Sequence, residues 1–245
     1  MMSTLKNRIA IVTGASRGIG RATAELLAKE GAHVVITARG REQLEEVADG
    51  IRKEGGKVTA IPGDVTNPDD VSRVFEAAQS EDGSLDILVN NAGIGILGSL
   101  SEMSIEDFDL QLDINVRSVF LYTRAIIPIL SANGGGNIVN IASISGLAGM
   151  AGATAYSATK WATIGMSRGL DKELSPLGIK VTAICPAGVD TTWAFGTGID
   201  PVDVTDADRL SPATIAESVL FAIKQPKNAR VTEMVVYPMS ENGHQ

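Results

Sequence analysis

Short apolar runs alternate with longer amphipathic stretches along most of the chain. The runs have the length and continuity of strands buried on both faces, and they stand at 8–13, 33–37, 57–61, 85–89, 137–142, 180–185 and 231–237. Between them, apolar residues recur three and four positions apart, which is the period of a helix with one buried face. This alternation predicts an α/β fold, a single-domain Rossmann-type doubly wound parallel sheet of about seven strands with helices on both faces.

Capping residues mark several of the predicted helices. Asn67-Pro68 is typical of an N-cap followed by the first helical residue. Ser104 predicts the start of a helical region from 105 to about 130, disturbed near Pro128. Further helices are expected at 154–174 and 212–224.

The chain shows no internal repeat and no domain boundary, so we expect residues 1–245 to form one domain. One long irregular segment, at 187–210, follows the sixth strand and carries two large apolar residues, Trp193 and Phe195. Ligands of doubly wound sheets bind outside the carboxyl ends of the strands. The irregular segment starts at that edge, and its position there predicts a lid over a substrate.

The first strand runs directly into a glycine-rich turn and then a helix. Glycines let the backbone approach phosphate groups, and a helix N-terminus supplies unpaired N–H groups and positive dipole. The spacing is Gly-x-x-x-Gly-x-Gly, which differs from the more common Gly-x-Gly-x-x-Gly. The turn therefore predicts a binding site for the pyrophosphate of a dinucleotide, formed by Gly14, Ser16, Arg17, Gly18, Ile19 and Gly20.

The end of the second strand indicates which dinucleotide is bound. The sequence there is Thr37-Ala-Arg39, with no carboxylate before Glu42. A carboxylate at this place serves NAD by accepting from the ribose hydroxyls, whereas a guanidinium binds the 2′-phosphate of NADP. Arg39, helped by Arg17, predicts NADP, with two merely solvated arginines as the alternative. Asp64 and Val65, after the third strand, are predicted to bracket the adenine.

Composition narrows the classes of partner and the compartment. The chain of 245 residues has a net charge of −8, which argues against nucleic acid or an anionic membrane as the main partner. The one cysteine, Cys185, cannot form an internal disulfide, as is usual in a reducing compartment. No apolar run approaches the ~18 residues of a membrane span or resembles a signal peptide. We expect a cytoplasmic protein.

Tyr156 and Lys160 are four residues apart and share one face of a predicted helix. An ammonium beside a phenol favours the phenolate, and a phenol that ionises near neutrality is a usable acid and base. The pair alone is equally compatible with an ordinary helix face. Ser143 stands just beyond the fifth strand, however, at the edge where the glycine turn and Pro186 also lie, and this convergence predicts one site.

Together these residues resemble the short-chain dehydrogenase/reductase (SDR) family over nearly the whole chain. Residues 13–20 look like its cofactor turn, and Asn90-Asn-Ala-Gly93 looks like its sheet-stabilising motif. Its catalytic tetrad is matched by Asn115, Ser143, Tyr156 and Lys160, with Ser143 thirteen positions before Tyr156.

The resemblance implies a role for each member of the tetrad. Tyr156 would be the general acid/base, and Ser143 would hold the substrate oxygen. Lys160 would bind the nicotinamide ribose and lower the pKa of Tyr156, while Asn115 would hold a bend in its helix and a relay water. The resemblance further implies cofactor contacts from Asn91, Ala92, Gly93, Pro186, Gly188, Val189 and Thr191. It also implies a homo-oligomer packed through the long helices, a tetramer or alternatively a dimer.

Three departures bear on the substrate. Residues 186–188 read Pro-Ala-Gly where the family usually has Pro-Gly, so the backbone beside the nicotinamide is expected to differ. Residues 94–98 lack the Thr-Arg-Asp of fatty-acid 3-ketoacyl reductases, and the C-terminal segment lacks their Asp-Gly-Gly. The acidic net charge also does not favour docking of an acidic carrier protein.

The expected function is that of an NADP(H)-dependent oxidoreductase that interconverts a ketone or aldehyde and an alcohol without a metal. The substrate is expected to be a small, apolar molecule, and neither nucleic acid nor a membrane is an expected partner. Its predicted contacts are Ser143, Ser145, Tyr156, Ile94, Ile96, Leu147, Met150, Trp193 and Phe195. Two alternatives stay open, a 3-ketoacyl carrier-protein reductase and a non-catalytic, nucleotide-sensing protein of the same fold.

Overall fold

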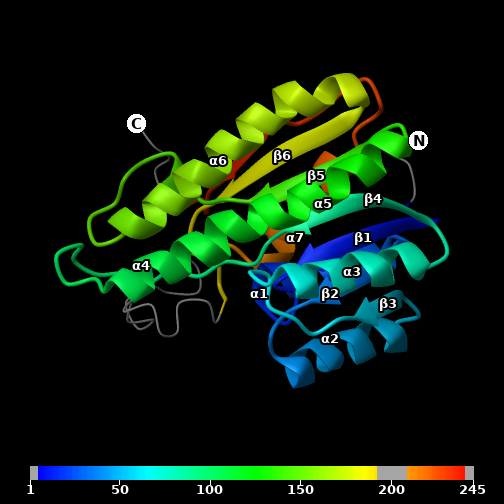
Figure 1. Ribbon diagram of the computed structural model, residues 1–245, viewed down its shortest axis with the longest axis horizontal. Coiled ribbons are helices and arrows are strands. Elements are labelled where there is room, and N and C mark those ends of the chain that lie inside the picture. The colour runs from blue at the N-terminus through cyan, green and yellow to red at the C-terminus, as the bar shows by residue number, and fades with distance from the viewer. Residues whose placement is uncertain (1–4, 192–208, 241–245) are drawn as a thin grey trace.

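The computed structural model describes residues 5–191 and 209–240. A sheet of seven parallel strands runs through it in the order β3-β2-β1-β4-β5-β6-β7 (Figure 1). The strands are β1 (Arg8–Thr13), β2 (His33–Thr37), β3 (Lys57–Ala60), β4 (Ser84–Asn90), β5 (Gly136–Ile141), β6 (Ile179–Pro186) and β7 (Glu233–Val236). The strand order reverses between β1 and β4, so the predicted doubly wound α/β sheet is confirmed.

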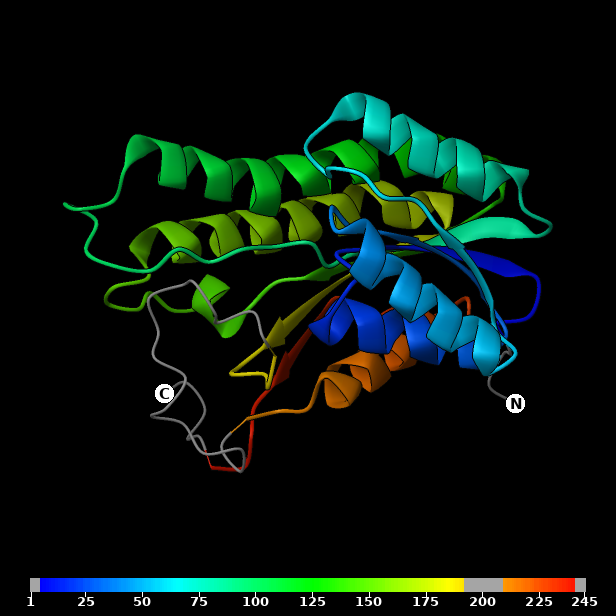
Figure 2. The same cartoon turned by 90° about the horizontal axis from the view of Figure 1, so that it is seen from below.

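Helices cover both faces of this sheet (Figure 2). They are α1 (Gly18–Lys29), α2 (Arg41–Lys53), α3 (Pro68–Ser80), α4 (Ile105–Leu112), α5 (Ser118–Ala132), α6 (Thr154–Leu174) and α7 (Pro212–Ile223). Short 3₁₀ turns at Ile144–Gly146 and Ser175–Leu177 flank α6. The helices α1, α2 and α7 pack on one face, and α3, α5 and α6 pack on the other.

Burial on both faces explains why the strands are continuously apolar. Ala10 and Val12 of β1 belong to the core under α1, α2 and α7. Ile9 and Ile11, which alternate with them, belong to the core under α3, α5 and α6. Successive side chains of a strand point to opposite faces, so a sheet covered on both sides needs an apolar residue at every position.

Two predicted helix starts are confirmed by their capping bonds. The Asn67 side chain accepts from the N–H of Asp69, and Pro68 is the first residue of α3. The Ser104 side chain accepts from the N–H of Asp107 at the start of α4. Each bond satisfies an N–H group that has no partner within its helix.

The predicted disturbance of the long helix near Pro128 is wrong. Pro128 lies inside α5, which continues through it to Ala132. The irregularity is a π turn at Asp113–Arg117, between α4 and α5, where the N–H of Ser118 bonds to the carbonyl of Asp113 five residues back. Asn115 lies within this π turn, so the distortion of the helix falls at a predicted site residue.

Among the described residues, no helix has the length and apolarity needed to cross a membrane. Most of the predicted lid at 187–210, with Trp193 and Phe195, lies outside the described residues. The lid therefore stays a prediction.

Candidate active site

Four neighbouring strands of the sheet end at the predicted site. Thr13 ends β1, Asn90 ends β4, Ser143 follows β5 by two residues, and Pro186 ends β6. Because β1, β4, β5 and β6 are adjacent and parallel, their carboxyl ends meet at one edge. Residues from distant parts of the chain thus come together where ligands of doubly wound sheets bind.

The glycine turn is crowded to the limit of what a backbone allows. Gly14 has a φ of +63°, and a Cβ on it would stand 2.8 Å from the Cα of Ala92. A Cβ on Gly20 would stand 2.3 Å from the carbonyl oxygen of Gly14. Helix α1 begins at Gly18, and among the described residues no side chain caps its N-terminus. The turn therefore offers a close-fitting backbone surface beside a helix N-terminus that has no side-chain cap, as an anion site requires.

Asn91 joins this turn to the end of β4. Its amide nitrogen donates to the carbonyls of Thr13 and Gly14, at 2.9 and 3.1 Å. In return, the Thr13 hydroxyl oxygen accepts from the backbone N–H groups of Asn91 and Ala92, both at 3.0 Å. The sequence prediction included Thr13 in the cofactor turn but gave its hydroxyl no role, although a hydroxyl at the end of an otherwise apolar strand was a usable signal.

A buried chain of amides and hydroxyls lies beneath the site. The Asn90 amide donates to the Asn140 side-chain oxygen at 2.8 Å, and the Asn140 amide donates to the Ser167 hydroxyl at 2.9 Å. Ser167 donates in turn to the Thr163 carbonyl within α6. The chain of bonds ties β4, β5 and α6 together, and fully satisfied buried networks of this kind rigidify their surroundings.

Asn115 lies in the π turn and is 2% exposed. Its amide accepts from the N–H of Ile94 and donates to the carbonyl of Ile94, both at 2.8 Å. It also donates to the Thr159 hydroxyl of α6 at 3.0 Å. Asn115 therefore bridges the segment after β4 and the helix that carries Tyr156 and Lys160.

Ser143, Tyr156 and Lys160 are brought together as predicted. Ser143 lies close enough to Tyr156 to lower the pKa of its phenol. Ser143 also accepts from the N–H of Ser145, which fixes its hydroxyl at the start of a 3₁₀ turn. The Lys160 ammonium lies 5.7 Å from the centre of the Tyr156 ring and donates to the carbonyl of Ile141 at 2.9 Å.

Burial shifts the two titratable groups in opposite directions. It raises the pKa of Tyr156 to about 12, although the neighbouring Ser143 lowers it. It lowers the pKa of Lys160 to about 8, against an opposing effect of Cys185. In the protein by itself, desolvation outweighs the lowering effect of Ser143 on the phenol, and the effect of Lys160 on the pKa of Tyr156 stays a prediction. The site holds Tyr156 as the neutral phenol.

The residues expected at the adenosine end lie at the carboxyl ends of β1, β2 and β3. Arg39 is exposed after β2, and Arg17 is exposed in the turn between β1 and α1. Val65 is buried, and Asp64 accepts from the N–H and hydroxyl of Thr66 through one oxygen, each at 2.8 Å. These bonds stabilise the loop after β3. Both are made to the Oδ1 atom of Asp64.

The departure at 186–188 is accommodated by pairing with β7. Pro186 is the last residue of β6, and the N–H of Ala187 donates to the carbonyl of Val236 at 2.9 Å. Val189 then forms an isolated bridge with Leu210. Thr191 lies beside the glycine turn, because a Cβ on Gly18 would stand 3.0 Å from its methyl group.

The predicted substrate residues fall into three groups. Ile94 and Leu147 are partly buried and pack against the cores, so each is at least partly structural. The hydroxyl of Ser145 donates to the sulfur of Met150 at 3.3 Å, and Met150 is half exposed. Trp193 and Phe195 lie outside the described residues.

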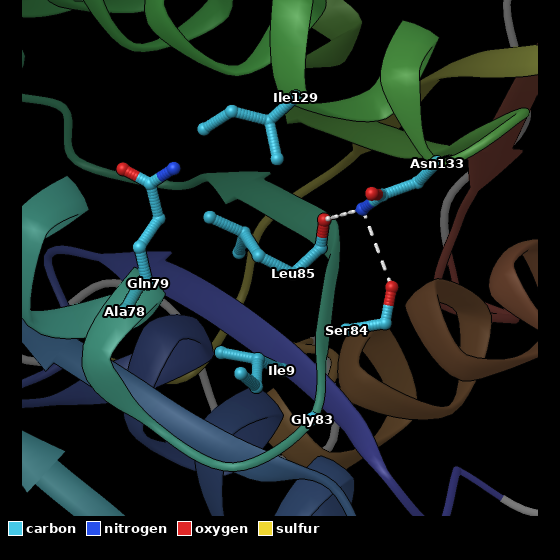
Figure 3. Close-up of a pocket in the computed structure, with 8 residues that line it drawn as sticks. All are labelled: Ile9, Ala78, Gln79, Gly83, Ser84, Leu85, Ile129 and Asn133. Atoms are coloured by element: carbon cyan, nitrogen blue, oxygen red, sulfur yellow. Dashed lines mark hydrogen bonds between the residues drawn. The ribbon is translucent and has the colours of Figure 1, made fainter.

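A cavity of about 230 Å³ lies at the opposite end of the sheet (Figure 3). It is lined by Ile9, Ala78, Gln79, Gly83, Ser84, Leu85, Ile129 and Asn133, none of which titrates. The Asn133 amide donates to the Ser84 hydroxyl and to the Leu85 carbonyl. The cavity opens at the amino ends of β1 and β4, away from the predicted site.

Known proteins resemble this chain in sequence and in structure. A model of short chain dehydrogenases matches residues 8–197. An uncharacterized oxidoreductase of Staphylococcus aureus (strain USA300) is 40% identical over 238 residues, which cover 97% of this chain and 100% of that protein.

Two solved structures superpose over most of the chain. The 3-ketoacyl-(acyl-carrier-protein) reductase from Brucella melitensis, complexed with NADH, gives a TM-score of 0.87 at 32% identity, over 95% of this chain and 97% of that one. The alcohol dehydrogenase from the archaeon Thermococcus sibiricus, complexed with 5-hydroxy-NADP, gives 0.88 at 29% identity, over 97% and 99%.

Proposed function

The chain belongs to the short-chain dehydrogenase family of oxidoreductases, and from this membership we propose that it interconverts a small carbonyl compound and an alcohol with NADP(H). The observation that carries the proposal is the proximity of the Ser143 hydroxyl to the Tyr156 phenol, with the Lys160 ammonium beside the Tyr156 ring. Two hydroxyls at one point polarise a carbonyl oxygen, and one of them can deliver a proton.

The residues present fit a dinucleotide. A Cβ at Gly14 or Gly20 would collide with backbone, so the turn is kept bare, and α1 presents an uncapped N-terminus beside it. Gly14 to Gly20 would hold the pyrophosphate, Asn91 to Gly93 the inner ribose, and Val189 and Thr191 the nicotinamide amide. Bound there, the cofactor would supply or accept the hydride.

Preference for NADP rests on charge at the end of β2. Arg39 is exposed where an NAD enzyme usually has a carboxylate, and Arg17 is exposed in the neighbouring turn. Guanidinium groups bind phosphate oxygens through charge-assisted bonds, and no carboxylate stands between Thr37 and Glu42 to repel such a phosphate. The similar structures include one with NADH and one with an NADP derivative, so they favour neither.

Tyr156 acts as the proton donor when a carbonyl is reduced. Its pKa of about 12 keeps the phenol protonated, which is the form that can donate to an alkoxide as it develops. Ser143 would hold the same oxygen through its hydroxyl. Lys160, with a pKa of about 8, is mostly cationic at neutral pH and stabilises negative charge that passes to Tyr156.

Exposed apolar residues on the helices support a homo-oligomer. Phe120 on α5 is 51% exposed and Trp161 on α6 is 50% exposed. Large apolar side chains on packed helices are typical of association surfaces. We expect a tetramer, with a dimer as the alternative, and a solution mass near that of one chain would contradict this.

The decisive experiment is a spectrophotometric assay with NADPH or NADH and a panel of ketones and aldehydes. We expect turnover with NADPH, and replacement of Tyr156 by Phe should lower kcat/KM by roughly 10²–10⁴-fold. Cofactor binding, measured by fluorescence, should change little because the ring is kept. Full activity of Tyr156→Phe would refute the mechanism, and the absence of turnover on every compound would favour a nucleotide-sensing protein.

A second candidate, reduction of 3-ketoacyl thioesters on a carrier protein, is favoured by the similarity to the Brucella melitensis reductase. Acetoacetyl thioesters in the same panel separate the two candidates. A kcat/KM on the thioester well above that on simple ketones would favour the second.

A further inference from the structure

A buried amide stands one helical turn before Asn115. Within α4, all of which the structure describes, the one buried residue is Gln111, which is 0% exposed. A glutamine on a short surface helix ordinarily faces water, because burial of an amide is unfavourable unless its hydrogen bonds are satisfied. Its burial therefore points to a specific set of contacts.

Gln111 bonds to the segment that follows Gly93. Its side-chain oxygen accepts from the N–H of Ile96 at 3.0 Å, and its side-chain nitrogen donates to the sulfur of Met103 at 3.7 Å. The backbone N–H of Ile96 can only donate, so it must face the amide oxygen, and this fixes the orientation of the amide. The bond links α4 to residues 94–98, here called the 94–98 loop.

Three contacts at alternate residues hold this loop. Asn115 binds both backbone groups of Ile94, Gln111 binds Ile96, and the N–H of Gly98 donates to the carbonyl of Gly152 at 2.7 Å. Asn115 and Gln111 are four residues apart and so lie on one face across the α4 boundary. The middle contact depends on one side chain alone.

The loop runs along the candidate active site. At its start, a Cβ on Gly93 would stand 3.6 Å from the Lys160 ammonium nitrogen. At its end, Gly152 lies four residues before Tyr156. Ile96 lies between these points and is partly exposed. Ile96 therefore lies on the stretch of chain between the neighbourhood of the Lys160 ammonium and the contact with the segment that precedes Tyr156.

We propose that Gln111 is a positioning residue that determines substrate specificity by fixing Ile96 at the wall of the substrate site. The proposal rests on the proposed carbonyl–alcohol function. Gln111 touches neither the tetrad nor the cofactor turn among its hydrogen-bonding contacts, so its effect should appear in substrate choice and not in proton transfer. Loss of its oxygen leaves the N–H of Ile96 without its acceptor, and the loop must move to find another.

The test compares Gln111→Leu and Gln111→Glu with the unmodified protein on one small and one bulky ketone that the protein turns over. Gln111→Leu should raise KM for the bulky ketone about tenfold, change kcat less than about threefold, and shift the ratio of kcat/KM between the ketones. Gln111→Glu keeps an acceptor oxygen at the same place, so it should retain most of that ratio. Affinity for NADPH should be unchanged in both variants.

The matched control is Ser118→Ala. Ser118 is also buried, but its hydroxyl donates only within its own helix segment, to the carbonyl of Ile114. It should leave the ketone ratio unchanged. An unchanged ratio in Gln111→Leu, or an equal fall in kcat for both ketones, would overturn this proposal alone. If Gln111→Leu does not fold, Gln111→Glu decides. A changed ratio of kcat/KM between the two ketones in Gln111→Glu overturns the proposal. An unchanged ratio, together with slow hydrogen exchange of the Ile96 amide, supports the proposal. Failure of the unmodified protein to reduce any ketone would overturn the proposed function as well.

Discussion

The glycine turn at 14–20 and the 94–98 loop border the same site but are held in different ways. The turn is fixed by steric contact, since even a methyl group on Gly20 has no room. The loop is fixed by hydrogen bonds with Asn115, Gln111 and Gly152. Close packing tolerates few substitutions, whereas a segment held at separate points can change between its anchors.

This difference matches the two ligands that the site is proposed to bind. The part of the site proposed to hold the dinucleotide is built from backbone and small residues, which suit a ligand that does not vary. The part proposed to hold the substrate is held in place by side chains of α4 and the π turn, and replacement of a single side-chain amide would change its shape. Three predictions test this contrast.

The largest effect is expected from Gly20→Ala compared with Gly149→Ala. The new methyl on Gly20 would stand 2.3 Å from the carbonyl oxygen of Gly14, so the turn must shift. Overpacking of this kind costs about 1–3 kcal/mol or more, and we expect NADPH affinity to fall by about 100-fold. Titration of cofactor fluorescence measures the loss.

Gly149 provides the control, because it lies in the segment between β5 and α6 and a Cβ on it would meet nothing within 4 Å. Its replacement should leave cofactor affinity and melting temperature nearly unchanged. Equal losses in the two variants would remove the contrast between the crowded turn and the substrate side.

The next prediction concerns Lys160, which lies where the two regions meet. Burial lowers the pKa of Lys160 from 10.5 to about 8. Below pH 8 the free energy of the charged ammonium is therefore about 3 kcal/mol higher in the folded protein than in the unfolded chain. Lys160→Met should therefore raise the free energy of unfolding at pH 7 by about 2 kcal/mol, after loss of the bond to Ile141. The same variant should lose activity.

The sign of the pH dependence makes this prediction specific. Between pH 8 and 10.5 the unfolded chain still binds the proton that folded Lys160 has released, so the unmodified protein gains stability as the pH rises. The advantage of Lys160→Met should shrink across this range and vanish at about pH 9.5, where the gain of the unmodified protein reaches about 2 kcal/mol. Urea unfolding at pH 7 and pH 9.5 measures the gap, and a gap independent of pH would contradict the burial argument.

The fold was predictable because its signals are local. Continuous apolar runs locate β1 and β2 to the residue, and Asn67 and Ser104 mark helix starts through their own side chains. The π turn was not predictable, because it is stabilised by bonds from Asn115 to Ile94 and Thr159, which lie far away in the sequence. The sequence therefore suggested Pro128 as the disturbance, which is a local signal without the expected effect.

The sequence predicts which side chains of the candidate site lie near one another, because their spacing along helices and strands determines this. It does not predict the properties that depend on burial. Helical spacing places Tyr156 beside Lys160, and the strand ends place Ser143 near both. The direction of the Tyr156 pKa shift depends on how much water the surrounding chain excludes, which no spacing reveals. Gln111 escaped notice for the same reason, since a polar residue on an amphipathic helix ordinarily faces solvent.

The smallest effect is expected from replacement of Arg39. This residue tests the contrast because it lies on the cofactor side but is not held by packing. Arg39 is exposed, so its replacement should cost almost no stability. Arg39→Ala would remove the proposed charge-assisted bond to the 2′-phosphate, and we expect KM for NADPH to rise about tenfold while KM for NADH stays the same. The ratio of kcat/KM for the two cofactors measures the effect.

Arg39→Lys is the matched variant, because it keeps the positive charge but not the planar guanidinium. It should fall between Ala and the unmodified protein if the phosphate is bound by charge and geometry together. An unmodified protein that uses NADH as efficiently as NADPH would contradict the assignment of Arg39. Such a result would leave the crowded turn as a general dinucleotide site, because the contacts of Gly14 and Gly20 with the backbone do not depend on the 2′ position.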